Sequence, residues 1–537
     1  MTGLSFQSAS STVAPFQEKP WRRWRPRFQA LVALLALIPI ALFLVASLGR
    51  LGFAFPLEQL EGPMLLAAER VAHGQPIYVR PNFTFIPYMY APAYYYVSGW
   101  AVRLLGPRFL ALRVVSLLSA CASMAVIYLF VFLDSPGSRG RRHLAGLAAA
   151  GIYVAAYPWT RQWFDLGRLD SFYILLLLLA LLATRHLHPI FAAAMWTLAF
   201  LAKQTIFPVA LVMLCVDWKR PRRLLLGVGS FLLMTAFSSR LLDQATHGWF
   251  WFYAFTVPHA NADLWLRPAV FYVPSQLIAP YGVALLIVAM AWVRSRPSLS
   301  SFRTRFYLIA GAALFGLCWF LQAHAGATAN TPMPAYAILA VIFGISFARL
   351  DAVFTFASLE AARVLLLAAV AIPFISWIYN PHDFMPHRDL AASQKELISW
   401  LRIFPGDVFL PAHPYEGVLA GKQWHADNTA LHDALRPEMP GVNNAVRAEI
   451  GQEVDESKFD AIVLDGLPDD TLPSQPWLPA DLMQRYPIIG IVPGSDVNDQ
   501  FGPHPTYFLL PCREKTWAVA HGWKLIETGG QSACASD

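Results

Sequence analysis

The sequence FQALVALLALIPIALFLVASL, residues 28–48, directly follows the basic stretch WRRWRPR, residues 21–27. A helix needs about 20 apolar residues to cross the hydrocarbon core of a membrane, and residues 28–48 supply that length. A cleaved signal peptide would have a shorter apolar core and a cleavage site of small residues. We therefore expect an uncleaved membrane anchor with its basic end in the cytoplasm, because Lys and Arg beside a span favour that side.

The composition of the whole chain supports a membrane protein with many spans. Of its 537 residues, 56% are hydrophobic and 14% are charged, and the mean hydropathy is +0.44. Soluble domains carry about 25% charged residues, so disordered proteins, nucleic-acid-binding tails and ordinary cytosolic enzymes are excluded. From Pro381 onward lie 22 of the 34 Asp and Glu but only 11 of the 41 Lys and Arg. The sequence thus predicts a basic membrane domain followed by an acidic domain of ordinary polarity.

Apolar runs recur along the membrane domain. After the first run they cover residues 110–133, 144–160, 168–184, 189–202, 205–217, 222–241, 274–293, 304–322, 332–349 and 361–380. The sequence therefore predicts an α-helical polytopic membrane protein with about eleven transmembrane helices. The stretch Pro92–Leu105 is rich in Tyr and carries Arg103. We expect this stretch to lie at the membrane surface instead of crossing it.

Basic loops predict which side of the membrane each segment faces. Arg and Lys cluster at residues 139–142, 219–223 and 294–305. Cytoplasmic loops are enriched in these residues, and eleven spans place all three clusters inside. Counting Pro92–Leu105 as a span would place the first cluster outside. The expected domains are a cytoplasmic tail at 1–27, a membrane domain at 28–381 with its first outer loop at 50–109, and an extracytoplasmic domain at 382–537.

Few carboxylates lie on the outer side of this membrane domain, and acidic residues near membrane depth are costly enough to suggest function. Glu61 precedes Gly62-Pro63, which is a helix-start signal. The helix N-terminus favours an ionised carboxylate, which could serve as a general base. A plain helix-start acid explains the pattern as well, and the same alternative applies to Glu58.

Charged residues in the later outer loops provide further candidates. Arg168 and Asp170 alternate at the outer end of an apolar run. They form either a polar site at the outer leaflet or a local ion pair that closes a helix end. Lys203 and Gln204 separate two short apolar runs. The Lys203 ammonium could hold a lipid phosphate or could snorkel to the interface.

Two more loops face the same side. The aromatic loop that begins at Trp249 and includes Arg267 either flanks a lipid chain or anchors the loop at the interface. His324 lies in the last short outer loop, where it either contacts a sugar or phosphate or belongs to a plain turn. No Cys, His or carboxylate cluster has metal-ligand spacing. A Gly-rich phosphate loop is absent from the sequence, which argues against an ATP-driven pump.

The acidic part, residues 382–537, predicts a small α/β domain. Ser393–Ile403 has the pattern of an amphipathic helix. Strands are expected at 407–410, 459–464, 486–492 and 507–510. Cys512 and Cys534 could form a disulfide if this domain faces an oxidising compartment. The sequence leaves open whether this domain binds an acceptor or whether its polar segments are only turns.

Several short motifs occur in a fixed order. They are Glu61-Gly62 with Ala67-Ala68-Glu69-Arg70 and Gly74-Gln75-Pro76-Ile77-Tyr78, Tyr90-Ala91-Pro92-Ala93-Tyr94-Tyr95, Leu112-Arg113-Val114-Val115-Ser116, Arg168-Leu169-Asp170-Ser171, and Phe200-Leu201-Ala202-Lys203-Gln204-Thr205. Over about residues 28–350 this order resembles the membrane-embedded GT-C glycosyltransferases, of the protein O-mannosyltransferase and aminoarabinose transferase types. That family often has two adjacent acids in its first outer loop. Here position 60 is Leu, so only Glu61 matches.

The resemblance implies transfer of a sugar from a polyprenyl-phosphate donor to an acceptor hydroxyl on the outer face, with inversion. Glu61 would deprotonate the acceptor, and Asp170 would orient the acceptor or Arg168. Arg168 and Lys203 would stabilise the departing phosphate. The remaining residues that we expect to contact substrate are Gln204, Tyr90, Tyr94, Glu58, Arg267 and His324.

The resemblance also implies partners and a location. The acceptor would be a glycan, lipid or protein, membrane lipids would surround the chain, and nucleic acid would not be a partner. The enzyme would be a multi-pass protein of the cell (inner or plasma) membrane. No cofactor is implied with certainty, because use of a divalent metal varies across the superfamily.

Two non-enzymatic functions remain as alternatives. A flippase or transporter for lipid-linked sugars would need polar groups along a path through the membrane. A scaffold that binds polyprenyl phosphate would need Lys203 but would tolerate loss of Glu61. Neither alternative releases free polyprenyl phosphate.

Overall fold

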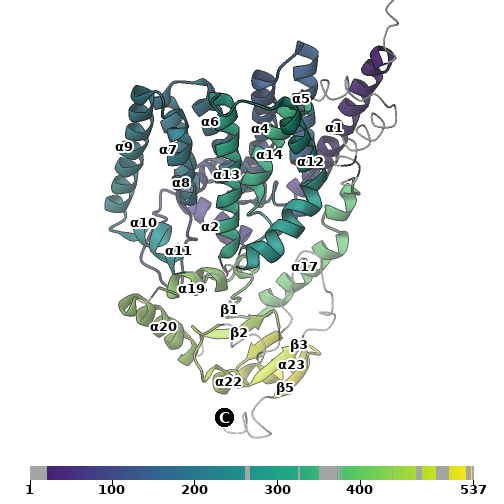
Figure 1. The fold of residues 1–537 in the computed structure, drawn as a ribbon. Helices are drawn as coiled ribbons and strands as arrows, with labels where there is room; N and C mark the ends of the chain where they lie inside the picture. Colours follow the sequence, from purple (N-terminus) through teal and green to yellow (C-terminus); the bar gives the residue numbers. More distant parts are fainter. Residues whose placement is uncertain are drawn as a thin grey trace, which may run out of the picture.

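The computed structural model is a helical bundle joined to a small α/β domain (Figure 1). It describes residues 21–260, 266–324, 327–349, 378–437, 439–456, 458–466, 475–491 and 507–527, together with Ile372, Ile375, Pro468 and Cys534. The helices of the bundle and its loops are α1 (Trp21–Leu51), α2 (Glu61–Ala72), α3 (Ala93–Leu105), α4 (Phe109–Asp134), α5 (Arg139–Val154), η1 (Pro158–Thr160), α6 (Asp170–His186), α7 (Pro189–Ala202), η2 (Gln204–Ile206), α8 (Phe207–Leu214), η3 (Cys215–Asp217), α9 (Pro221–Ala245), α10 (Trp249–Trp251), η4 (Phe252–Thr256), α11 (Val257–His259), η5 (Pro268–Ile278), α12 (Ala279–Ser295), α13 (Phe302–Ala323) and α14 (Met333–Phe347).

Each apolar run predicted before residue 350 contains a helix, whereas the last run, 361–380, lies almost entirely outside the described residues. Among the described residues, five helices are long and apolar enough to cross a membrane: Gln29–Leu51, Phe109–Asp134, Pro221–Ala245, Pro268–Val293 and Phe302–Ala323. The other helices of the bundle are shorter, so the total of about eleven crossings stays a prediction. The stretch Pro92–Leu105 forms the separate helix α3, which packs on α2.

The predicted basic loops meet at one end of the bundle. Arg142 Nε donates to the Phe132 carbonyl at 2.5 Å, and Arg303 donates to the Asp134 carbonyl. Arg185 Nε donates to the Asp134 carboxylate at 2.8 Å. The C-terminal domain lies at the opposite end (Figure 1). The grouping predicted from charge is therefore confirmed, and the assignment of the basic end to the cytoplasm stays a prediction.

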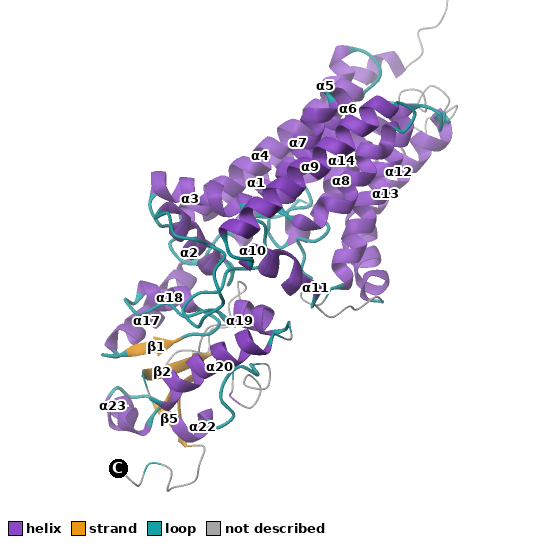
Figure 2. Cartoon of the chain, turned by 90° about the vertical axis from the view of Figure 1, so that its left-hand side faces the viewer, coloured by secondary structure: helices purple, strands orange, loops and turns teal. Residues whose placement is uncertain are grey.

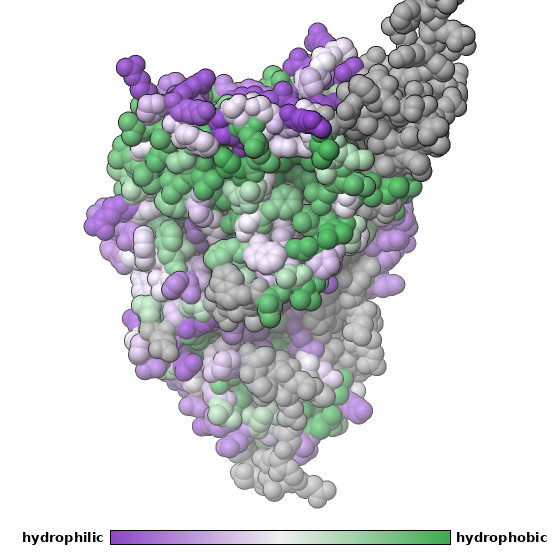
Figure 3. All heavy atoms as spheres, in the orientation of Figure 1, coloured by the Kyte–Doolittle hydropathy of each residue, from purple (hydrophilic) through white to green (hydrophobic). Residues whose placement is uncertain are grey.

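Apolar side chains form a band across the bundle, between a hydrophilic rim at the basic end and the more polar C-terminal domain (Figure 3). Helix α9 illustrates how this surface differs from the surface of a soluble protein. Leu225, Leu233 and Phe237 on α9 are 72%, 71% and 68% exposed. A large contiguous apolar surface is unfavourable in water, so this band suits contact with lipid.

The acidic part folds as a five-stranded sheet with helices on both faces. Its elements are η6 (Pro381–Phe384), α17 (Arg388–Ile403), β1 (Asp407–Phe409), α18 (Pro414–Leu419), α19 (Asn428–Leu435), α20 (Pro440–Asp455), β2 (Phe459–Leu464), α22 (Leu482–Arg485), β3 (Ile488–Ile491), β4 (Tyr507–Leu510), η8 (Cys512–Glu514), α23 (Lys515–Ala520) and β5 (Lys524–Glu527). The strand order is β1-β2-β4-β3-β5, with β1 and β2 parallel and the other pairs antiparallel. All four predicted strands are confirmed. The sequence analysis missed β5, which is a half-exposed edge strand.

Successive residues of these strands face opposite sides, as the pleat of a strand requires. In β1, Val408 packs in a core with α17 and α23, whereas Phe409 faces the core shared with the membrane domain. Cys512 and Cys534 form a disulfide, which settles the pairing that the sequence left open. The domain boundary predicted at 381/382 stays a prediction.

The first outer loop fixes the C-terminal domain to the bundle. Phe83 from this loop is 2% exposed, and its ring lies 5.0 Å from that of Phe409 and 4.7 Å from that of His425. The backbone N–H of Ala426 donates to the Phe83 carbonyl at 2.8 Å, and the Phe83 N–H donates to Glu449 at 2.9 Å. Figure 2 shows α2 and the C-terminal domain at the same end of the bundle. The two parts therefore share one packed junction.

A group of ion pairs within the C-terminal domain predicts a pH dependence of stability. His413, just before α18, lies 3.4 Å from Glu416 and 3.3 Å from Asp465. Burial alone would lower the His413 pKa, but the two carboxylates raise it to about 10. The folded state thus binds a proton that the unfolded state releases near pH 6.5. The stabilisation is complete below that pH and is lost as pH rises toward 10.

We expect the Tm of the wild-type protein to fall between pH 6.5 and 10, and His413→Gln to remove part of that fall. A shift of one pKa unit corresponds to about 1.4 kcal/mol, so the difference is measurable by thermal unfolding at several pH values. The exposed His521 provides the matched control, His521→Gln. Equal pH profiles for wild type and His413→Gln would contradict this prediction.

Candidate active site at the domain junction

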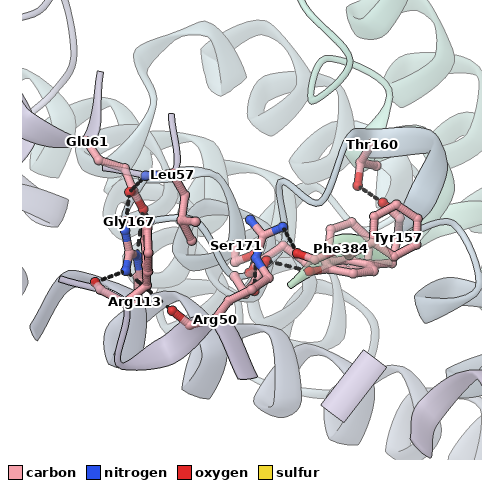
Figure 4. Close-up of polar contacts among 12 residues, drawn as sticks. Arg50, Leu57, Glu61, Arg113, Tyr157, Thr160, Gly167, Ser171 and Phe384 are labelled. Carbon is pink, nitrogen blue, oxygen red and sulfur yellow. Dashed lines mark hydrogen bonds and ion pairs between the residues drawn. The ribbon is translucent and has the colours of Figure 1, made fainter. Parts of the chain in front are cut away.

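Glu61 is the first residue of α2 and is fully buried. Its Oε1 accepts from the Gly167 N–H at 2.6 Å and from Arg113 Nε at 3.1 Å. Its Oε2 accepts from the Leu57 N–H at 2.8 Å and from Arg113 Nη2 at 2.6 Å (Figure 4). Burial would raise the Glu61 pKa, but Arg113 and the two N–H groups outweigh it and hold the pKa below its usual value.

Two glycines make room for this arrangement. A Cβ at position 167 would lie 2.9 Å from Leu112 Cβ and 3.1 Å from Glu61 Oε1. A Cβ at position 62 would lie 2.7 Å from Tyr415 Cβ of the C-terminal domain. Because larger residues would clash there, these glycines let the loop and α18 approach the start of α2 closely.

Arg113 comes from α4 and is 1% exposed. Besides Glu61, its guanidinium donates to the Phe53 carbonyl at 2.6 Å and the Phe55 carbonyl at 2.7 Å. A planar guanidinium with five donors suits such a set of acceptors. Arg113 therefore ties the loop after α1 to the start of α2.

Arg168 and Glu58 form the second ion pair of the site. Arg168 is 2% exposed; its Nη1 donates to Glu58 Oε2 at 2.8 Å and its Nη2 donates to the Tyr90 hydroxyl at 3.1 Å. Its Nε is buried and makes no hydrogen bond to any described residue. The Glu58 side chain is 22% exposed. Burial raises the Glu58 pKa above its usual value, although Arg168 opposes the shift.

Asp170 and Lys203 form a third pair. Lys203 Nζ donates to Asp170 Oδ1 at 3.1 Å, and the Asn330 amide donates to the same oxygen at 3.0 Å. Trp163 Nε1 donates to Asp170 Oδ2 at 2.6 Å. The Lys203 side chain keeps 16% exposure and lies 5.5 Å from the Tyr173 ring centroid. Asp170 is thus held by three donors, while Lys203 keeps donors for a ligand.

A fourth pair links the site to the C-terminal domain. Arg50 at the end of α1 lies 3.0 Å from Asp165, and the Tyr157 hydroxyl donates to Asp165 at 3.0 Å. Arg50 Nη1 also donates to the Phe384 carbonyl at 3.3 Å (Figure 4). We call the eight residues of the four pairs the charged cluster: Arg50, Glu58, Glu61, Arg113, Asp165, Arg168, Asp170 and Lys203.

The structure brings five of the predicted site residues into the charged cluster and places Tyr90 in contact with it. Tyr94 is buried near the Phe172 ring, at 6.3 Å between centroids. Gln204 Nε2 donates to the Met89 and Ala254 carbonyls at 2.9 and 2.8 Å, so its amide joins two loops. Both donors of the amide are thus used by the backbone, and a contact of Gln204 with substrate stays a prediction.

The remaining two predicted residues lie on different loops that contact each other, because Arg267 of the aromatic loop reaches the last outer loop, which contains His324. Arg267 Nη1 donates to the His324 carbonyl at 3.4 Å, and Nη2 donates to the Ala327 carbonyl at 2.8 Å. Asn330 of the same loop is the residue that reaches Asp170. A contact of Arg267 or His324 with substrate stays a prediction.

The sequence analysis gave no role to Arg50, Arg113 or Trp163. Arg113 did carry a signal, because an Arg inside an apolar run is costly unless it has a partner. The partner of Arg113 is more than fifty residues away in the sequence, at Glu61, so pattern alone could not pair them. Within the described part of the chain, no three His, Cys, Asp or Glu side chains lie where they could hold a metal ion together.

Comparison with known proteins finds solved structures that share the fold of this chain. No protein-family profile and no curated protein matches the chain. ArnT from Cupriavidus metallidurans bound to undecaprenyl phosphate matches at 15% identity and a TM-score of 0.56, covering 90% of this chain and 98% of that one.

Two further solved structures match. The apo state of ArnT matches at 15% identity and a TM-score of 0.50, over 74% and 85% of the two chains. The Archaeoglobus fulgidus oligosaccharyltransferase, in complex with Zn and sulfate, matches at 13% identity and a TM-score of 0.48, over 89% and 72%. The chain therefore has the fold of ArnT, which is itself a GT-C glycosyltransferase of the type that the order of these motifs resembles.

Proposed function

We propose that this protein is a membrane-embedded glycosyltransferase that moves a sugar from a polyprenyl-phosphate donor to an acceptor hydroxyl, with inversion. One observation carries the proposal. A partly exposed carboxylate, Glu58, lies against the buried guanidinium of Arg168, at the same end of the bundle as Lys203. The Nε–H of Arg168 has no hydrogen-bond partner among the described residues. A base and phosphate-binding cations are the groups that this reaction requires.

The reaction can be written with these groups. Glu58 takes the proton of the acceptor hydroxyl, and the oxygen attacks the anomeric carbon of the donor sugar. The bond between that carbon and the phosphate oxygen breaks on the opposite face, so the configuration inverts. Arg168 and Lys203 stabilise the charge that develops on the phosphate, which leaves as polyprenyl phosphate.

In this proposal Glu61 positions the site and does not accept the proton. The resemblance drawn from the sequence implied that Glu61 is the base. In the structure each of its oxygens already accepts two hydrogen bonds, and its side chain is fully buried. An acceptor hydroxyl needs a carboxylate oxygen within hydrogen-bond reach, and Glu58 offers the more accessible one. Asp170 likewise orients Lys203 and the last outer loop.

The choice of donor rests on the fold. The matched ArnT structure holds undecaprenyl phosphate, and the apolar band of this chain would accept a polyprenyl tail. The acceptor would be a glycan, lipid or protein. We place the enzyme in the cell membrane with its C-terminal domain outside, which the Cys512–Cys534 disulfide supports because disulfides persist in oxidising compartments.

A transporter or a scaffold for lipid-linked sugars is the alternative function. Transport would favour polar groups along the whole membrane path. Four ion pairs of the charged cluster instead lie at one end of the bundle, next to the C-terminal domain. This distribution favours chemistry at one membrane face.

The decisive assay uses purified protein in lipid vesicles with labelled polyprenyl-phosphate sugars. We expect loss of the donor, release of free polyprenyl phosphate and a labelled acceptor. Tight donor binding without any turnover would reject the transferase in favour of a transporter or scaffold.

A further inference from the structure

A buried carboxylate of the C-terminal domain lies next to the first outer loop. Asp427 precedes α19 and is 1% exposed. Its Oδ1 accepts from the Ala430 N–H at 3.0 Å and so caps the helix. Its Oδ2 is buried and, among the described residues, makes no hydrogen bond of standard geometry. A buried carboxylate oxygen without a donor is costly, so its retention needs an explanation.

The neighbour of this free oxygen is Tyr88 of the first outer loop. Tyr88 is 4% exposed, and its hydroxyl is likewise buried without a standard hydrogen bond to a described residue. The two side chains are close enough for each to shift the pKa of the other. Burial raises the Asp427 pKa to about 7, while Tyr88 and the Ala430 N–H partly oppose that rise.

Tyr88 in turn belongs to the wall of the charged cluster. The Tyr90 N–H donates to the Tyr88 carbonyl at 2.8 Å, and the Tyr95 hydroxyl donates to the same carbonyl at 3.3 Å. Two residues further along the chain, the Tyr90 hydroxyl accepts from Arg168 Nη2. Arg168 and Glu58 also influence the Tyr88 hydroxyl electrostatically. A short path of contacts therefore runs from Asp427 to the proposed phosphate-binding guanidinium.

We propose that Asp427 is a positioning residue of the transfer site, which it serves by holding Tyr88 and thereby the Tyr90 hydroxyl that orients Arg168. This inference rests on the proposed function, because it concerns the same site. It assigns the C-terminal domain a part in the reaction, in addition to any acceptor contact. Asp427 itself need not touch either substrate.

Contacts on both sides of Asp427 fix its place at the junction. The residue before it, Ala426, bonds to the Phe83 carbonyl, and the Asn428 N–H donates to the Pro411 carbonyl at 2.7 Å. On the other side, α19 packs against α11 of the membrane domain (Figure 2). The backbone on both sides of Asp427 is thus fixed by hydrogen bonds.

The test uses Asp427→Asn, because Asn is also a good helix cap and keeps the shape of the side chain. We expect kcat for sugar transfer to fall about 10-fold, since a small displacement of a positioning group has effects of that order. KM for the donor and the Tm should change little. The matched control is Asp433→Asn on the same helix, where Asp433 pairs with Arg436 instead.

A double variant separates positioning from a general loss of stability. Tyr88→Phe should lower kcat by a similar factor, and Asp427→Asn combined with Tyr88→Phe should lower it no further, because both changes break one path. Additive losses would overturn the inference. So would equal losses in Asp427→Asn and Asp433→Asn.

Hydrogen exchange gives a readout that does not depend on turnover. We expect faster amide exchange at residues 86–96 in Asp427→Asn than in wild type or Asp433→Asn. Unchanged exchange at these residues would overturn the positioning role. A wild-type protein without turnover would reject the proposed function, while the exchange comparison would still decide whether Asp427 orders this loop.

Discussion

Replacement of Glu58 by Gln is expected to lower sugar transfer by about 10²–10⁴-fold, the usual contribution of a general base. Gln keeps an acceptor for the Arg168 N–H, and the Glu58 side chain is 22% exposed, so the Tm should stay close to that of wild type. The loss should appear in kcat with labelled donor. Binding of the donor should persist, because Arg168 and Lys203 remain.

The pH profile gives an independent check on the same residue. Burial raises the Glu58 pKa above its ordinary value of 4.5. The base must be deprotonated to act, so transfer should fall as pH drops through this raised pKa, and Glu58→Gln should lack that limb. The control is Glu69→Gln, the same change at a carboxylate of α2 that does not belong to the charged cluster. Full activity of Glu58→Gln, with loss in a folded Glu61→Gln variant, would return the base to Glu61.

The sequence could predict the fold because its strongest signals are local. Apolar length identified the helices, and the basic loops grouped at one end as their charges required. Arg168, Asp170 and Lys203 were also found from local pattern, since charged residues at the ends of apolar runs are rare and costly.

The pairing of these residues could not be predicted, because it depends on contacts between distant segments. The resemblance implied that Glu61 is the base, while its position at a helix start was equally consistent with a structural acid. Only the structure shows that Arg113 and the Gly167 N–H donate hydrogen bonds to the carboxylate oxygens of Glu61. Gln204 and Asp427 are two further residues whose contacts depend on distant segments. The sequence could not show that the Gln204 amide joins two loops, nor that Asp427 of the acidic domain lies next to the first outer loop.

Replacement of Arg113 by Met is expected to have the largest effect on stability. It would leave the Glu61 carboxylate buried without its charge partner, and breaking a buried ion pair from one side costs about 3–5 kcal/mol. The carbonyls of Phe53 and Phe55 would also lose a donor. Thermal unfolding followed by Trp fluorescence should show a Tm lower by several degrees. The matched control is Arg103→Met, because Arg103 is exposed on α3 and such surface changes cost about 0.5 kcal/mol or less.

Two further observations distinguish a lost ion pair from lost packing. Protonation of Glu61 would remove the unpaired charge, so the destabilisation of Arg113→Met should shrink as pH falls. For the same reason Glu61→Leu combined with Arg113→Met should recover much of the stability that either single change loses. A pH-independent loss, or a double variant that is less stable than the sum of both changes predicts, would show that the pair does not act through its charges. Recovery of stability without recovery of transfer would instead show that the Glu61–Arg113 pair is kept for the geometry of the site, since the loop from Phe53 to Glu58 is the segment that Arg113 holds.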